Sequence, residues 1–439
     1  MSALLLQLPP EILLEIIELL YEDYCLVDVD SDPEVIDISW LFSEQVEGWR
    51  GDPLEALRLY EFFLPHDSRI LYPRRTCKFL ANLCTPTLFQ SLDLTRLRNG
   101  DQEFLFKFIS KLGHAVKDLS LNMMLDSRSR AEGEDFNARV LDHCDAVRRL
   151  TIFHEKDDES EPRPLFDNIR GLSSLEEIHI IDADEWLDFW DDIPSIDAPK
   201  HLAHRLLDVV LDAHASHLRS IVLFGVLPLS IATFEKIQHT VPKLSRLEII
   251  RGLSVHHRES LATPAAWACA ANLQHVSLTR CRGAHAAIFT RQLAAGAIGH
   301  LRTLYMSICG AWSDDETLPG AAKWTIPALE VLELDHFAEW EMRHFAMIHV
   351  KKVFLSRVWQ MAGMREAQAL IKAMTDTTTF PEAIELHVSP EWGDQDFDDL
   401  QAACLTREIK VVERDWWFRE KEGYTKKRVF PLNLHPARP

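Results

Sequence analysis

The sequence lacks the features of a disulfide-bonded or zinc-binding protein. Its eight cysteines are scattered over 439 residues and no two form a C-x-x-C pair, the spacing that zinc sites and redox motifs commonly use. The twenty histidines are also dispersed, with His256–His257 and His201/His204 as the closest groupings. We therefore expect a reducing compartment, cytoplasmic or nuclear, and no metal or cofactor.

Positive charge and long apolar runs are also scarce. Acidic residues outnumber basic ones by 68 to 47, giving a formal net charge of -21. Nucleic-acid binding relies on clustered Lys and Arg, so we expect no nucleic-acid partner. The apolar N-terminal stretch is interrupted by Glu11, Glu15 and Glu18, and no later segment approaches the roughly 18 to 20 apolar residues of a membrane span. A membrane partner is therefore not expected either.

Recognisable catalytic motifs are missing as well. The chain has no G-x-S-x-G, H-E-x-x-H or kinase-type signature, and no glycine-rich nucleotide-binding loop. We therefore predict that the protein is not an enzyme.

What the sequence does contain is a repeated apolar pattern, in which an apolar residue is followed three and five positions later by two more. Successive copies mostly begin 26 to 31 residues apart, with one step of 43 and one of 21. This period is close to that of leucine-rich repeats. The copies are Phe89/Leu92/Leu94, Val116/Leu119/Leu121, Val147/Leu150/Ile152, Leu175/Ile178/Ile180, Leu218/Ile221/Leu223, Leu244/Leu247/Ile249, Leu273/Val276/Leu278, Leu301/Leu304/Met306, Leu329/Leu332/Leu334 and Val350/Val353/Leu355, with weaker ones at Ile384/Leu386 and Ile409/Val411.

Each copy predicts a half-buried strand, because its second half alternates between apolar and other residues. Apolar residues at three- and four-residue steps predict helices in between, at 100–112, 201–214, 229–239, 284–295 and 360–374. Such units are too small to bury their own apolar sides and must stack. We predict an α/β fold, a leucine-rich-repeat-like solenoid with parallel strands and helices behind them, over residues 89–412. A doubly wound sheet with one compact core is the alternative.

Strand residues that alternate with the buried ones would form the inner surface of such an array. We predict that this surface binds a protein substrate whose identity the sequence does not give, because the side chains have mixed character and define no single ligand class. The candidate residues are Glu177, His179, Arg246, Glu248, His275, Tyr305, Glu333, Asp335, Lys352 and Phe354.

The N-terminal segment predicts a short apolar helix that begins at Pro9 and Pro10. Ile16, Ile17 and Leu20 share one face of it with Leu13, while Ile12 widens that face. This is more apolar surface than one packing partner covers, so we expect a second protein to bind it.

These residues carry a resemblance to a known family. The opening Leu8-Pro9-Pro10-Glu11-Ile12-Leu13 followed by Ile16 resembles the start of an F-box, and 76–89 is similar to its third helix and exit, as in fungal F-box proteins with irregular leucine-rich repeats. The resemblance implies that the segment binds the Skp-type adaptor of a cullin ubiquitin ligase and that the repeats select its substrate. The implied adaptor-binding residues are Leu8, Pro9, Ile12, Ile16, Ile17, Leu20, Cys77, Lys78 and Leu80.

The F-box-like region, 1–88, departs from the family in length. Roughly fifty-six residues separate Leu20 from Cys77, and about 21–52 reads as an acidic insertion in a loop. The alternatives are a degenerate F-box on an interaction scaffold without a ligase link, or a region that only caps the first repeat.

Two further segments combine aromatic residues with charge. Residues 182–192 contain three aromatic and six acidic residues. We expect either a protruding loop that binds a basic partner or an insertion whose rings pack back onto the array. Residues 413–439, with Trp416, Trp417 and Phe418, are expected to form a C-terminal cap and tail.

Overall fold

The structure is a computed structural model of the chain. It describes residues 13, 90–94, 106, 109–123, 130–154, 163–182, 202–224, 231–250, 268–269, 271–279, 300–307, 329–335, 349–356, 363–377, 380–388 and 394–413. These residues belong to two compact units, the first made of 1–153, 162–175 and 417–439, the second of 154–161 and 176–416.

The described residues of the first unit include three parallel strands and the helices α7 and α8. Strand β2 pairs with β1 on one side and β3 on the other. The last residue of β3 falls in the second unit. The elements are β1 (Ser91–Asp93), the short 3-10 helix η4 (Gly113–Ala115), β2 (Asp118–Asn122), α7 (Arg130–His143), β3 (Arg149–His154) and α8 (Arg163–Gly171).

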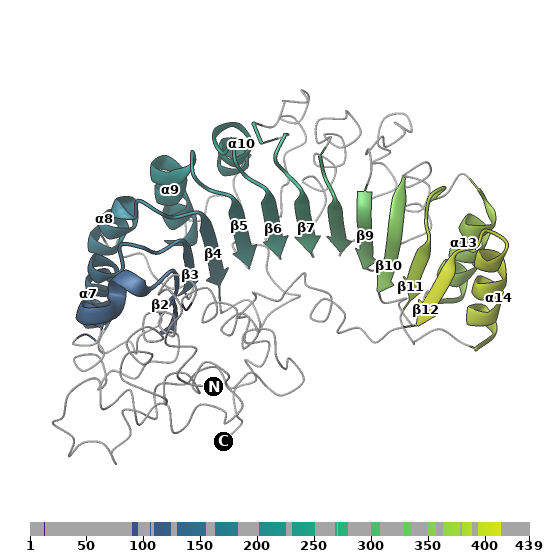
Figure 1. The fold of residues 1–439 in the computed structure, drawn as a ribbon, viewed down its shortest axis with the longest axis horizontal. Coiled ribbons are helices and arrows are strands. Elements are labelled where there is room, and N and C mark those ends of the chain that lie inside the picture. The colour runs from purple at the N-terminus through teal and green to yellow at the C-terminus, as the bar shows by residue number, and fades with distance from the viewer. Residues whose placement is uncertain are drawn as a thin grey trace, which may run out of the picture. The chain divides into compact units, whose positions relative to one another are not determined.

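The second unit contains a long sheet of nine described strands, each parallel to its neighbours and paired in chain order. Its described helices lie on one side of that sheet (Figure 1). The elements are β4 (Glu177–Asp182), α9 (Leu202–His214), β5 (Ser220–Phe224), α10 (Ile231–Thr240), β6 (Arg246–Ile250), β7 (His275–Thr279), β8 (Thr303–Ser307), β9 (Leu329–Asp335), β10 (Val350–Ser356), α13 (Gly363–Thr375), β11 (Glu385–Val388), α14 (Asp394–Leu405) and β12 (Lys410–Glu413).

The repeat pattern located the strands correctly. Its ten main copies coincide with β1 to β10 and the two weaker copies with β11 and β12. The strand order runs in one direction within each unit, whereas a doubly wound sheet reverses its order at a switch point. That alternative is therefore wrong. The α/β class with a long parallel sheet is confirmed, and the arrangement is compatible with a solenoid-like repeat.

Three of the predicted helices are present as α9, α10 and α13. Residues 106 and 109–112 of the predicted helix 100–112 are also helical, and the predicted helix 284–295 lies outside the described residues. Helices α7, α8 and α14 were not predicted. No described helix is long and apolar enough to cross a membrane.

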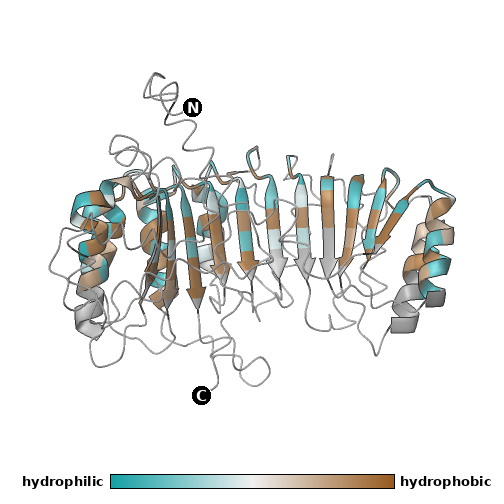
Figure 2. Cartoon of the chain, turned by 60° about the horizontal axis from the view of Figure 1, so that its bottom comes forward, coloured by the Kyte–Doolittle hydropathy of each residue, from teal (hydrophilic) through white to brown (hydrophobic). Residues whose placement is uncertain are grey.

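A continuous apolar row crosses the sheet of the second unit. It consists of the middle apolar residue of each repeat, and the register pairs each member with the next. These side chains are at most 3% exposed, and each contributes roughly 1.5–3 kcal/mol by burial. Figure 2 shows the apolar bands at matching heights on neighbouring strands. The row is Ile178, Ile221, Leu247, Val276, Leu304, Leu332, Val353 and Leu386.

Buried residues also mark the turns that lead into several strands. The carbonyl oxygen of Cys144 accepts a hydrogen bond from the Val147 amide at 3.4 Å, and that of Cys269 accepts one from the Leu273 amide at 2.9 Å. Both cysteine side chains are fully buried. These two cysteines are thus small apolar residues of the repeat, which explains why they lie far apart in the sequence.

Side-chain hydrogen bonds to the backbone connect neighbouring repeats. Asn168 Nδ2 donates to the Ala138 carbonyl at 2.6 Å, and Asn272 Nδ2 donates to the Pro242 carbonyl at 2.8 Å. Each bond spans thirty residues, about one repeat. Regular leucine-rich repeats use a ladder of asparagines for this purpose. Here individual asparagines at other positions join neighbouring repeats.

Candidate interaction surface

The sheet face opposite the apolar row carries the polar strand residues of the second unit. We call it the recognition face. Its first row, in register across the nine strands, is Glu177, Ser220, Arg246, His275, Thr303, Val331, Lys352, Glu385 and Lys410. Its second row is His179, Val222, Glu248, Ser277, Tyr305, Glu333, Phe354, His387 and Val412.

All ten substrate-binding candidates named from the sequence belong to this face. Nine occupy the two rows, and Asp335 follows Glu333 two residues further along β9. The structure does not describe the side chains of Glu333 and Asp335, so only their register is known. The register aligns these residues along one side of the strands, while their role in binding stays a prediction.

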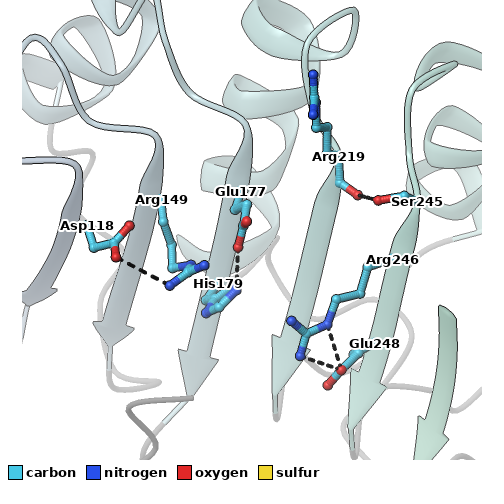
Figure 3. Close-up of polar contacts among 8 residues, drawn as sticks. All are labelled: Asp118, Arg149, Glu177, His179, Arg219, Ser245, Arg246 and Glu248. Carbon is cyan, nitrogen blue, oxygen red and sulfur yellow. Dashed lines mark hydrogen bonds and ion pairs between the residues drawn. The ribbon is translucent and has the colours of Figure 1, made fainter. Parts of the chain in front are cut away.

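The β4 end of the face holds a carboxylate and an imidazole. Glu177 and His179 lie two residues apart on β4, and their Oε2 and Nε2 atoms are 4.0 Å apart (Figure 3). The His179 side chain is buried, whereas that of Glu177 is 29% exposed. A partner that approaches this end therefore meets the carboxylate first.

A largely buried ion pair lies on β6, the third strand of the face. Arg246 Nε donates to Glu248 Oε1 at 2.9 Å, and Arg246 Nη2 lies 2.8 Å from the same oxygen (Figure 3). Glu248 is 3% exposed, and burying a carboxylate without an opposite charge is costly. Arg246 thus compensates this carboxylate before any partner binds.

The next strand pair carries a histidine that interacts with a hydroxyl group. His275 Nδ1 lies 2.6 Å from Thr303 Oγ1 across β7 and β8. Burial, followed by the charges of Arg246 and Arg302, lowers the pKa of His275 below its ordinary value of 6.5. At neutral pH this imidazole is therefore uncharged and offers hydrogen bonds without adding charge to the face.

The far end of the face holds a connected cluster of four side chains. Glu385 Oε2 accepts from Lys352 Nζ at 3.2 Å and interacts with His387 Nε2 at 3.0 Å. The His387 ring in turn stacks on Phe354. The hydrogen bond from His387, followed by Lys352, lowers the pKa of Glu385. Glu385 and His387 were not among the substrate-binding residues predicted from the sequence. The apolar pattern on β11 is weak, so it did not indicate which residues of that strand lie on this face.

The first unit carries a comparable cross-strand pair. Arg149 Nη1 on β3 lies 3.5 Å from Asp118 Oδ2 on β2, and the two residues are register partners (Figure 3). Exposure of the Asp118 side chain is 41%, so water weakens this pair.

The chemistry of the recognition face suits binding by many small contacts. Its described charged groups interact mainly with one another, as in Arg246–Glu248 and Lys352–Glu385. Among the described residues no group of three or more His, Cys, Asp or Glu could hold a metal ion. The face thus offers hydrogen-bonding groups and half-buried aromatic rings across many strands.

The adaptor-binding candidates are in a different position. Leu8, Pro9, Ile12, Ile16, Ile17, Leu20, Cys77, Lys78 and Leu80 all lie outside the described residues, as does the acidic insertion. Leu13 is described, and it is helical and 2% exposed. Comparison with known proteins adds nothing to this picture, since neither the family models nor the curated proteins contain a match to the chain.

Proposed function

We propose that this protein is the substrate-recruiting subunit of an SCF-type (Skp–cullin–F-box) ubiquitin ligase. The N-terminal helices would bind the Skp-type adaptor, and the recognition face would hold a protein for ubiquitin transfer by another subunit. One observation carries the proposal. An F-box-like sequence directly precedes the repeats, and the sheet of the second unit presents two register-aligned rows of mostly polar residues over nine strands.

The dimensions of the recognition face support a protein partner. Neighbouring strands lie about 4.8 Å apart, so nine strands extend over roughly 38 Å. That length fits an interface of standard size, which buries about 800 Å² on each partner. Tyr305 and Phe354 are partly exposed on this face, and half-buried aromatic rings are frequent anchors of protein interfaces.

Copurification with the purified Skp-type adaptor tests the ligase assignment. We expect wild type to retain the adaptor and the variants Ile12→Asp and Ile16→Asp to lose it, since a buried carboxylate opposes apolar docking. Lys372→Glu, an exposed change on α13, serves as the control and should bind like wild type. Failure of the wild-type chain to retain the adaptor would remove the ligase from the proposal.

A second function is favoured by a specific observation at the N-terminus. Leu13 belongs to the apolar helix face that a partner is expected to cover, yet it is already 2% exposed within the chain. Together with the insertion after Leu20, this supports a non-catalytic scaffold whose degenerate F-box contacts its own chain. The scaffold predicts no adaptor binding and a partner whose abundance does not change when this protein is depleted.

A further inference from the structure

Four neighbouring strands in the sheet of the second unit have basic N-terminal ends, although the protein as a whole is acidic. We call the residues that lead into β5, β6, β7 and β8 the basic rim; they are 217–220, 243–246, 272–275 and 300–303. These sixteen residues include Arg219, Lys243, Arg246 and Arg302, and no Asp or Glu. Acidic residues return on both sides, with Glu176 before β4 and Glu330 in β9.

Backbone hydrogen bonds place the four segments of the rim side by side. The Ser245 amide donates to the Arg219 carbonyl at 2.8 Å, and the Gln274 amide donates to the Ser245 carbonyl at 2.9 Å. The Arg302 amide then donates to the Gln274 carbonyl at 2.8 Å. Arg219 and Arg302 are thus three strand steps apart, a separation of roughly 15 Å.

Three of the four cations are available to solvent. The Arg219 side chain is 62% exposed, and its Nε is 3.8 Å from Glu176 Oε2. Lys243 and Arg302 are exposed and have no carboxylate partner among the residues that the structure describes. Arg246 differs, because its charge is compensated by Glu248. The solvent-exposed positive charge of the rim therefore lies just before β5, β6 and β8, at Arg219, Lys243 and Arg302.

His275 lies in the rim beside Arg246, its register partner on β6. After burial, the charges of Arg246 and Arg302 contribute most to its lowered pKa, ahead of the opposing effects of Glu248 and Glu330.

We propose that the basic rim binds an acidic segment of a partner protein, an extended stretch with several Asp or Glu residues. This inference rests on the proposed role of the second unit's sheet in binding a partner protein, and it names the chemistry of that partner. The cations are spread over several strands, whereas recognition of one phosphate requires donors that converge on one point. An extended chain advances about 3.3 Å per residue, so four or five residues cross from Arg219 to Arg302.

Fluorescence anisotropy with the full-length protein tests the inference. The probe is a fluorescein-labelled peptide with six glutamates separated by Gly and Ser, and the reference peptide has six glutamines instead. We expect wild type to bind only the glutamate peptide, and less tightly at 300 mM than at about 50 mM salt, since exposed charges are screened. Arg219→Gln combined with Arg302→Gln should weaken binding by about tenfold, because each exposed pair contributes little by itself.

The matched control removes two exposed cations outside the rim, with Lys111→Gln and Lys372→Gln. It should bind the glutamate peptide like wild type, and equal urea midpoints would show that all variants are folded. Equal weakening in the control, or no binding by wild type, would overturn the inference. So would binding of only a third peptide that carries one phosphoserine and no glutamate.

These outcomes are distinguishable from failure of the ligase assignment, because the peptide assay contains no adaptor. If adaptor binding fails and glutamate-peptide binding persists, the ligase assignment is rejected, while the inference that the rim binds an acidic segment is retained. If a native partner bound the Arg219→Gln/Arg302→Gln variant and wild type with equal affinity, the rim would not take part in partner recognition. That result would contradict the inference.

Discussion

Phe354 and His387 stack across neighbouring strands with their ring centroids 4.1 Å apart and their planes 9° from parallel. They are register partners in β10 and β11, separated by one repeat in the sequence. The His387 ring is 2% exposed, whereas Phe354 is partly exposed. Phe354 therefore packs against the buried histidine from the neighbouring strand, and its own partly exposed ring remains part of the surface of this face.

Replacing the stacked aromatic ring should destabilise the C-terminal repeats. Phe354→Ala removes the stack and part of a buried surface, and we expect a loss of about 1–2 kcal/mol in the free energy of unfolding. Urea unfolding followed by circular dichroism measures it. Leu405→Ala, at a side chain that is 77% exposed, is the control and should change the midpoint little. Equal midpoints for the two variants would mean that the stack contributes nothing.

The Glu385 carboxylate should make stability depend on pH. Its pKa in the folded protein is lowered below the ordinary value of 4.5, mainly by the hydrogen bond from His387. Its contribution is thus present above that value and is lost as the pH falls through the folded pKa. Glu385→Gln should therefore destabilise the protein near pH 7, and its difference from wild type should shrink below about pH 4.5. Urea midpoints between pH 7 and 3.5 measure this, and a difference that grew in acid would contradict it. Asp142→Asn, an exposed change on α7, controls for general charge effects.

Arg407 should be more important to the last repeats than its place in a surface turn suggests. Its Nη1 donates to the carbonyls of Met374 and Asp376, each at 3.1 Å, and its Nη2 donates to that of Phe380 at 2.8 Å. Arg407→Leu should cost about 2–3 kcal/mol, because these carbonyls lose a charged donor. Arg407→Lys should recover only part of this, since an ammonium group does not reproduce the planar fork. Hydrogen exchange of the α13 and β11 amides measures the effect, and a lysine variant as stable as wild type would contradict it.

The three cysteines among the described residues, all of them buried, should resist alkylation in the folded protein. Burial raises the pKa of Cys144 and of Cys269 to about 12, and that of Cys404 to about 11. The thiolate is the reactive form, so very little of it exists at pH 8. Mass spectrometry after iodoacetamide treatment should find these three unmodified in buffer and modified in urea. Rapid labelling without urea would show that these repeats open readily.

The sequence alone determined where the strands are and which of their residues share a face. Both properties depend on local alternation, which is visible within six or seven residues, so Leu247 and Leu332 could be assigned to the buried side and Arg246 to the opposite side. Even the weak apolar copies at the C-terminus predicted β11 and β12. The core-facing strand positions, such as Leu247 and Leu332, are apolar in repeat after repeat, so the pattern can be followed without knowing the neighbouring strands.

Only the tertiary structure decided which side chains meet. The contacts Phe354–His387, His275–Thr303 and Arg407 with the Phe380 carbonyl each join residues about one repeat apart. Repeat lengths in this chain are unequal, so the register between neighbouring strands cannot be counted from the sequence, and a slip of one residue would turn each side chain to the opposite face. The basic rim follows the same rule, because its cations gather only when four turns stack in register.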